Sequence, residues 1–169
     1  LSYTVHYIES GTTNTVAVDK VVNGQKFEDV ITENAIGVDG YEKVSPTTAN
    51  IEITLGTNEA TFYYTRRTDL TYKVYYKEQD TEIELADVKA GYDKTLGDTV
   101  EESAIDIEGY DKVAPTEAVI EINSEVNEYV FYYAKRTNII YTINYINRVT
   151  NLPAQDAKVV TTGTYLSTI

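Results

Sequence analysis

The sequence lacks cysteine, methionine and tryptophan, and its only histidine is His6. Without cysteine, the chain cannot form disulfides, use a thiol nucleophile or bind a metal through thiolates. Because no methionine is present, Leu1 is not a natural start, and we expect the chain to be a fragment of a longer array.

Basic residues are also scarce, since 14 Lys and Arg stand against 27 Asp and Glu and leave a net charge of −13. Nucleic acids and anionic membranes are bound largely through Lys and Arg, so neither is an expected partner. No run reaches the roughly 18 apolar residues that read as a transmembrane helix, and no signal peptide is recognisable. We therefore expect no membrane insertion of this part of the protein.

What the sequence does contain is a repeat. Tyr3, Tyr72 and Tyr141 follow one another at intervals of 69 residues, and Gly40–Thr47 recurs at the same interval as Gly109–Thr116. A unit of this length is large enough to hold a small core of its own. The predicted domains are copy 1 (residues 1–69), copy 2 (residues 70–138) and the truncated start of copy 3 (residues 139–169).

Alternating residues predict that each copy is rich in β-strands. Tyr3, Val5 and Tyr7 alternate with other residues at the start of copy 1, and this spacing places the three side chains on one face of a strand. The positions between them change from copy to copy, so we expect these to face solvent or a partner. Further strands are predicted over residues 16–22, 41–44, 51–55 and 60–65, and at the equivalent positions of copy 2.

A short helix is predicted in each full copy, over residues 28–36 and 97–105. Ile31 and Ala35 lie four residues apart, as on one face of a helix, and Asp29 stands where an N-cap belongs. The predicted order is β–β–α–β–β–β, which is an α+β fold with a mixed sheet and one short helix per copy. The junctions at residues 66–71 and 135–140 contain neither glycine nor proline, so we predict restricted bending between copies.

Three motifs recur in the same order in both full copies, and YTINY at Tyr141 opens a third copy. The motifs are YTVHY and YKVYY, GYEKVSPT and GYDKVAPT, and FYYTRR and FYYAKR. Their order and spacing resemble the MucBP (mucin-binding protein) repeats of Gram-positive bacterial surface adhesins. The resemblance implies tandem ubiquitin-like β-grasp domains that are monomeric units of a longer chain. It also implies a secreted protein attached to the cell wall, with its anchor signal outside this fragment, and adhesion to host mucin or another glycoprotein or glycan.

Two groups of side chains are candidates for ligand binding. Tyr63, Tyr75 and Tyr132 lie on the strand faces opposite the predicted core, where exposed tyrosines give rigid amphipathic contact area; the alternative is packing against the predicted helix or the neighbouring copy. The junctions carry the basic residues Arg66, Arg67, Lys135 and Arg136. These are expected to pair with acidic loops of the adjacent copy, or alternatively to bind a sialylated or sulfated ligand.

Two other kinds of site are weighed against simpler interpretations. Lys20 and Lys89 occupy equivalent positions in copies 1 and 2. They could form isopeptide bonds to Asn58 and Asn127, respectively, if a glutamate lay nearby. The preferred interpretation is that both are ordinary exposed lysines of a strand. The acidic residues around Gly109 suggest calcium, but their spacing fits no EF-hand loop and a solvated acidic turn is preferred. We predict no metal site and no cofactor.

The predicted function is binding without turnover. His6 is replaced by Tyr75 and Asn144 in the other copies, so a catalytic triad built on it is not expected. We predict non-catalytic adhesin repeats that bind host mucin or other glycoproteins weakly and multivalently. The alternative is a passive stalk that projects another adhesive domain from the cell wall.

Overall fold

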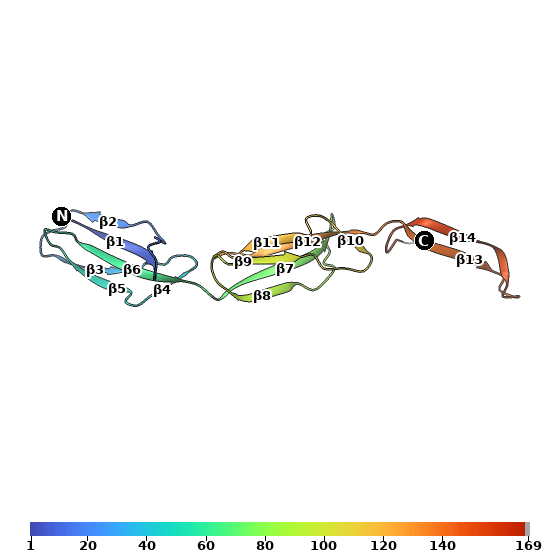
Figure 1. The fold of residues 1–169 in the computed structure, drawn as a ribbon, viewed down its shortest axis with the longest axis horizontal. Helices are drawn as coiled ribbons and strands as arrows, with labels where there is room; N and C mark the ends of the chain where they lie inside the picture. Colours follow the sequence, from blue (N-terminus) through green and yellow to red (C-terminus); the bar gives the residue numbers. More distant parts are fainter. Residues whose placement is uncertain (168–169) are drawn as a thin grey trace. The chain divides into compact units, whose positions relative to one another are not determined.

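A computed structural model describes residues 1–167 of the chain, and every regular element in that part is a β-strand (Figure 1). The predicted helices are absent from the described residues, so the α+β, ubiquitin-like β-grasp prediction is wrong. No helix of the described chain could therefore serve as a membrane span.

The described residues group into two compact units. The first comprises Leu1–Tyr72, Gly91–Thr99 and Glu121–Asn127, and the second comprises Lys73–Ala90, Val100–Ile120 and the chain from Glu128 onward. The unit boundaries do not coincide with the 69-residue repeat, because two segments of copy 2 group with copy 1. Strand pairing does follow the repeat, since each sheet is built from strands of a single copy.

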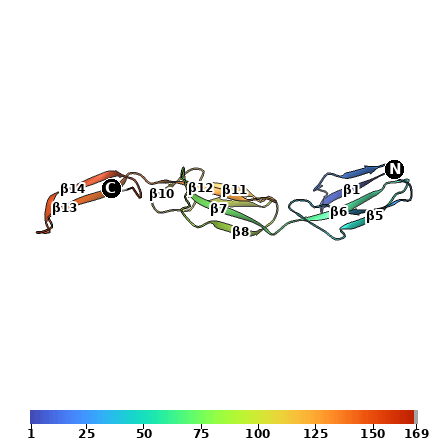
Figure 2. The same ribbon diagram turned by 180° about the vertical axis from the view of Figure 1, so that it is seen from behind.

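Copy 1 forms one four-stranded sheet and one two-stranded ribbon. Its strands are β1 (Ser2–Glu9), β2 (Lys20–Asn23), β3 (Val30–Asn34), β4 (Tyr41–Lys43), β5 (Thr48–Glu52) and β6 (Glu59–Arg66). The sheet has the order β2-β1-β6-β4, and β3 pairs with β5 in the ribbon. Strands β1 and β6 are parallel neighbours, with Tyr7 opposite Phe62, whereas the other pairs are antiparallel. Figure 2 shows β1 beside β6 from behind, so the first and last strands of the copy lie together at the centre of the sheet.

Copy 2 repeats this arrangement. Its strands are β7 (Leu70–Glu78), β8 (Lys89–Lys94), β9 (Thr99–Ser103), β10 (Tyr110–Lys112), β11 (Glu117–Glu121) and β12 (Glu128–Lys135). The sheet order is β10-β12-β7-β8, the ribbon is β11-β9, and β7 runs parallel to β12. Copy 3 contributes an antiparallel hairpin of β13 (Ile139–Ile146) and β14 (Pro153–Gly163).

The core of copy 1 lies between its sheet and its ribbon and is built largely from aromatic rings. Tyr3, Val5 and Tyr7 of β1 are buried at alternate positions, as the sequence predicts. Phe62 of β6 stacks on Tyr7 at a centroid distance of 6.4 Å, and Tyr64 meets the same ring edge-on at 6.3 Å. Each of these large rings removes a substantial apolar area from water, which suits a core of this size.

The segments predicted as helices are instead the ribbon strands β3 and β9. Ile31, Glu33 and Ala35 point inward at alternate positions. The four-residue spacing between Ile31 and Ala35, which suggested a helix, is therefore twice the two-residue repeat of a strand. A charged residue at the central inward position concealed this alternation. Asp29 does not cap a helix; its carboxylate accepts a hydrogen bond from the Lys26 amide at 3.2 Å and closes a turn.

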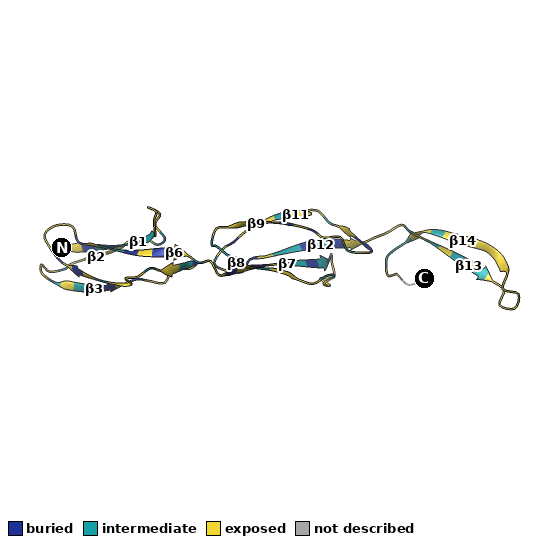
Figure 3. Cartoon of the chain, turned by 60° about the horizontal axis from the view of Figure 1, so that its bottom comes forward, coloured by how far each residue is buried: buried dark blue, intermediate teal, exposed yellow. Residues whose placement is uncertain are grey.

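The hairpin of copy 3 is less buried than the equivalent parts of copies 1 and 2. Tyr141, Ile143 and Tyr145 are half-buried on one face of β13, whereas Tyr3 and Tyr7 of β1 are buried. Figure 3 shows buried positions, in dark blue, on β7 and β12, while β13 and β14 are intermediate and exposed. Without further strands beside it, a hairpin covers only part of its own apolar face.

Candidate functional site

The outer face of the copy 2 sheet carries a group that we call the tyrosine face: Tyr75, Lys77, Glu82, Glu128 and Tyr132. Strands β7 and β12 supply four of the five residues, and Glu82 comes from the hairpin loop after β7. In the parallel register of these strands, Lys77 lies opposite Tyr132. Alternation along each strand points these side chains away from the buried rings.

Charged and aromatic groups of the tyrosine face contact one another. The Lys77 ammonium lies 3.2 Å from a Glu82 carboxylate oxygen and 5.6 Å from the centroid of the Tyr75 ring, a cation–π distance. The Tyr75 hydroxyl donates a hydrogen bond to the Glu128 carboxylate at 3.0 Å. These contacts hold the two ends of the face in place.

The same contacts shift the pKa values of the groups on this face. The hydrogen bond to Glu128 raises the pKa of Tyr75, and one to Glu82 raises the pKa of Tyr132. The Glu82 carboxylate also raises the pKa of Lys77. The raised pKa values keep the two phenols and the ammonium protonated at neutral pH, so the face offers hydrogen-bond donors.

An open hollow of about 390 Å³ lies beside Tyr132. Its lining consists of Gln79, Asp80, Glu82, Val113, Ala114 and Tyr132. The amide, carboxylate and phenol groups can exchange hydrogen bonds with a hydroxyl-rich ligand, and the ring and aliphatic side chains can cover its apolar parts. The arrangement suits binding of a polar molecule on the surface.

The equivalent face of copy 1 has different chemistry. Tyr63 is 46% exposed and lies opposite Ile8, the equivalent of Lys77. His6 takes the place of Tyr75, and its Nδ1 lies 2.8 Å from an Asp19 carboxylate oxygen. Tyr63, Tyr75 and Tyr132 thus all lie on outer sheet faces, but only the two in copy 2 belong to the tyrosine face.

The four basic residues at the junctions all have carboxylate partners. The ion pairs are Arg66–Glu9 at 2.7 Å, Arg67–Asp69 at 2.8 Å, Lys135–Glu78 at 3.3 Å and Arg136–Asp111 at 3.1 Å. All four carboxylates lie in the same copy as their basic partner, and Asp69 is only two residues from Arg67. The expected pairing with an adjacent copy is thus replaced by internal pairing. An anionic ligand would have to displace these partners.

Lys20 and Lys89 pair with glutamates at the boundary between sheet and ribbon. Lys20 Nζ lies 2.6 Å from Glu33 and Lys89 Nζ lies 2.7 Å from Glu102, while Tyr3 donates its hydroxyl to Glu33 at 2.5 Å. The candidate isopeptide partners are engaged elsewhere. Asn58 bonds to Thr54 and to the Ser2 carbonyl, and Asn127 bonds to the equivalent Asn123 and Thr71. The Lys–Glu pairs are ion pairs that join the ribbon to the sheet.

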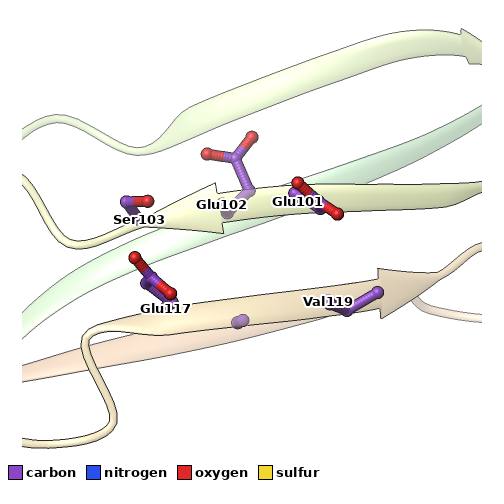
Figure 4. A pocket seen from close by; sticks show the side chains of 6 residues that line it. Glu101, Glu102, Ser103, Glu117 and Val119 are labelled. Atoms are coloured by element: carbon purple, nitrogen blue, oxygen red, sulfur yellow. The ribbon is translucent and has the colours of Figure 1, made fainter.

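A second hollow, of about 340 Å³, lies on the ribbon of copy 2. It is lined by Glu101, Glu102, Ser103, Glu117, Ala118 and Val119 of β9 and β11, and Figure 4 labels all of these but Ala118. The Glu102 carboxylate projects away from β11 and pairs with Lys89. The remaining carboxylates, Glu101 and Glu117, carry negative charge on an exposed ribbon face, which is acidic without being a defined site.

The acidic residues around Gly109 are also accounted for by pairs. Asp106 lies 2.9 Å from the Lys112 ammonium, and Asp111 pairs with Arg136. In residues 1–167, no group of three or more His, Asp or Glu side chains is placed to hold a metal ion.

Sequence reasoning identified the tyrosines of the candidate site but missed Lys77, Glu82 and Glu128 as their partners. Lys77 and Glu128 could have been found, because they lie on the same outer face as Tyr75 by strand alternation. Glu82 could not, because its approach to Lys77 depends on the path of the hairpin loop after β7.

Comparisons with known proteins add little to this geometry. No protein-family model matches the sequence, and a comparison with curated proteins finds no match. Among solved structures, the chain is similar to one described as "Crystal structure of Mub-RV", with 12% identity, a TM-score of 0.29, and coverage of 80% of this chain and 98% of that chain. At that TM-score the likeness does not establish a shared fold, so the functional proposal rests on the residues themselves.

Proposed function

We propose that this chain is a non-catalytic part of a secreted, cell-wall-attached adhesin that binds host mucin or another glycoprotein. The tyrosine face and its hollow carry the proposal, because they gather phenol, carboxylate and ammonium groups on an open sheet face. Such groups bind hydroxyl-rich glycans by hydrogen bonds and by ring contact. The resemblance of the sequence motifs to MucBP repeats supports the same class of partner.

A single tyrosine face should bind weakly, and several repeats that each carry such a face should together raise the apparent affinity. The hollow beside Tyr132 is open and lies at the small end of the range for ligand pockets. Linking several such sites in one chain raises the effective concentration of the second site once the first is bound. Binding to a polyvalent surface such as mucin should therefore be stronger than binding to one isolated glycan.

Retention of the full chain on immobilised mucin tests the proposal. We expect the chain to be retained in physiological salt and Tyr132→Ala or Tyr75→Ala to reduce retention. Tyr92→Ala is the matched control, because Tyr92 is 67% exposed in the same copy but lies outside the tyrosine face. Equal retention of all three variants and the parent would contradict the proposed site, provided that circular dichroism shows unchanged folding.

A stalk is the second candidate function, and the strand order favours it. The first and last strands of each full copy are parallel neighbours, so the chain enters one end of the sheet and leaves at the other. This arrangement lets copies follow one another as spacers. Absence of retention on mucin, fibronectin and a glycan array would favour the stalk over the adhesin.

A further inference from the structure

A four-residue turn, which we call the plug turn, recurs in all three copies at residues 26–29, 95–98 and 164–167. Each turn is closed by a backbone hydrogen bond, from Asp29 to Lys26, Asp98 to Thr95 and Ser167 to Thr164, at 3.2, 3.0 and 3.1 Å. The third residue of each turn has a positive φ: Glu28 at 68°, Gly97 at 86° and Leu166 at 56°. The residue before it, which is Phe27, Leu96 or Tyr165, is apolar or aromatic in every copy.

The Leu96 plug lies against a glycine turn of copy 1, within the first compact unit. A Cβ atom added to Gly40 would lie 2.8 Å from Leu96 Cδ2 and 2.9 Å from Cδ1, so the leucine occupies the space that a side chain would need. The Leu96 amide donates to the Arg67 carbonyl at 3.0 Å, and the Arg67 amide donates to the Gly40 carbonyl at 2.9 Å. Side chain and backbone therefore both join the plug to the glycine turn.

The Tyr165 plug makes the same contacts within the second compact unit. The Tyr165 amide donates to the Arg136 carbonyl at 2.9 Å, and the Arg136 amide donates to the Gly109 carbonyl at 2.8 Å. A Cβ atom at Gly109 would collide with the Tyr165 ring. That ring also meets Tyr110 edge-on, with centroids 5.6 Å apart. The side-chain contact with the glycine and both backbone hydrogen bonds of the Leu96 plug thus recur 69 residues later.

Phe27 occupies the plug position of copy 1 and is 53% exposed. Its turn has the same closing hydrogen bond and the same positive φ after the plug as the other two. Single exposed apolar side chains are common on protein surfaces, so the exposure of Phe27 is informative only because its turn matches the two turns whose plugs are docked. Leu96 and Tyr165, at the same position of their turns, each pack on a glycine turn. A glycine turn of the Gly40 type is therefore the surface that Phe27 should fit.

We propose that the plug residue of each copy docks on the glycine turn of another copy of the repeat, and that this contact fixes how consecutive copies are joined. Gly40 and Gly109 are required at the receiving turns for two reasons: their φ values are 79° and 80°, and a side chain would fill the space of the plug. This proposal concerns the joining of copies and holds whether or not the repeats bind glycoproteins.

Distance measurements between two spin labels test the proposal. Because the chain has no native cysteine, Glu52→Cys and Glu121→Cys place one label at equivalent exposed positions of copies 1 and 2. We expect a narrow distance distribution in the otherwise unchanged chain and a broad one when Leu96→Ala is added. Phe27→Ala is the matched control and should leave the distribution narrow, because Phe27 takes no part in this junction.

Two further measurements separate a lost contact from a lost fold. Leu96→Tyr copies the plug of copy 3 and should restore the narrow distribution. In Leu96→Ala, hydrogen exchange at the residue 96 amide should accelerate by about tenfold, equivalent to about 1.4 kcal/mol, while amides of the β7–β12 core keep their protection. A Leu96→Ala distribution as narrow as that of the parent, or a parent distribution as broad as that of Leu96→Ala, would overturn the proposal.

Discussion

Copies 1 and 2 share their inner face and differ on their outer face. Inside, Tyr7 stacks on Phe62 at 6.4 Å, and the equivalent Tyr76 stacks on Phe131 at 6.3 Å. Outside, a histidine–aspartate pair in copy 1 stands where copy 2 has the tyrosine face. Packing thus fixes the inner residues of the repeat, whereas the outer residues are free to change and can give each copy its own binding chemistry.

The largest expected effects come from the shared core. Phe62→Ala and Phe131→Ala should each lower the free energy of unfolding of their own copy by about 3–5 kcal/mol, because each leaves a cavity in the core beneath the sheet. Both side chains are 1% exposed, so the two losses should be similar. Urea unfolding of each variant measures them. Tyr63→Ala is the exposed control and should cost much less; strongly unequal losses for the two phenylalanines would show that the cores are not equivalent.

A buried asparagine should give the next largest effect in both copies. Asn58→Ala removes hydrogen bonds to the Thr54 amide and the Ser2 carbonyl, and it should cost about 1–3 kcal/mol because these groups lose a buried partner. Asn127→Ala should cost a similar amount in copy 2. The exposed Asn50→Ala is a control, and thermal unfolding provides the measurement. If Asn58→Ala proved as mild as Asn50→Ala, the hydrogen bonds of Asn58 would not stabilise the turn.

The Glu33 ion pair predicts a pH dependence of stability. The hydrogen bond from Lys20, followed by that from Tyr3, lowers the pKa of Glu33 below its usual 4.5. Stabilisation from this carboxylate is therefore complete above pH 4.5 and is lost as the pH falls through the lower pKa of the folded state. Glu33→Gln should lower stability by about 1–2 kcal/mol at pH 7 and should remove this part of the acid dependence.

Urea unfolding of the parent and of Glu33→Gln between pH 7 and pH 3 measures this dependence. Glu52→Gln, at an exposed position of β5, is the control and should follow the parent curve. Parallel curves for Glu33→Gln and the parent would mean that Glu33 does not carry the acid sensitivity.

The smallest expected effect is at the exposed ion pairs next to the junctions. Arg66 binds Glu9 in copy 1, and Lys135 binds Glu78 at the equivalent place in copy 2. Arg66→Lys makes copy 1 resemble copy 2 and should change the melting temperature only slightly, because exposed pairs contribute little and are screened by salt. A large loss that persists in high salt would indicate a role of Arg66 beyond this pair, such as its 3.4 Å hydrogen bond to the Leu96 carbonyl.

The sequence alone predicted the repeat, its strands and its aromatic core, because alternation along Tyr3–Tyr7 is strong and recurs in every copy. It predicted the ribbon strands β3 and β9 wrongly as helices, because Glu33 interrupts the inward apolar positions of β3; the β-branched run Val30–Thr32 was the signal for a strand. The second strand was predicted from Val16 but begins at Lys20, after an isolated bridge between Ile8 and Thr15.

The candidate site was only partly predictable. Outer-face tyrosines follow from alternation, but the partner Glu82 depends on a loop, and loop paths are set by tertiary contacts that a local pattern does not contain. The plug turns were missed for the same reason. Their recurrence at residues 27, 96 and 165 was visible in the sequence, yet nothing local indicates that a glycine turn receives them.

The parallel pairing of β1 with β6 has a mechanical consequence. Tension applied to both ends of copy 1 pulls these two neighbouring strands in opposite directions along their length. The six register pairs from Thr4–Glu59 to Glu9–Tyr64 are then loaded in shear and must yield together, whereas a hairpin pulled from its open end unzips one pair at a time. Copy 2 has the same six-pair arrangement between β7 and β12. The rate of forced unfolding depends on the height of the unfolding barrier. Because six pairs must break together, this barrier should be high, and a chain of these copies should resist unfolding when it is stretched.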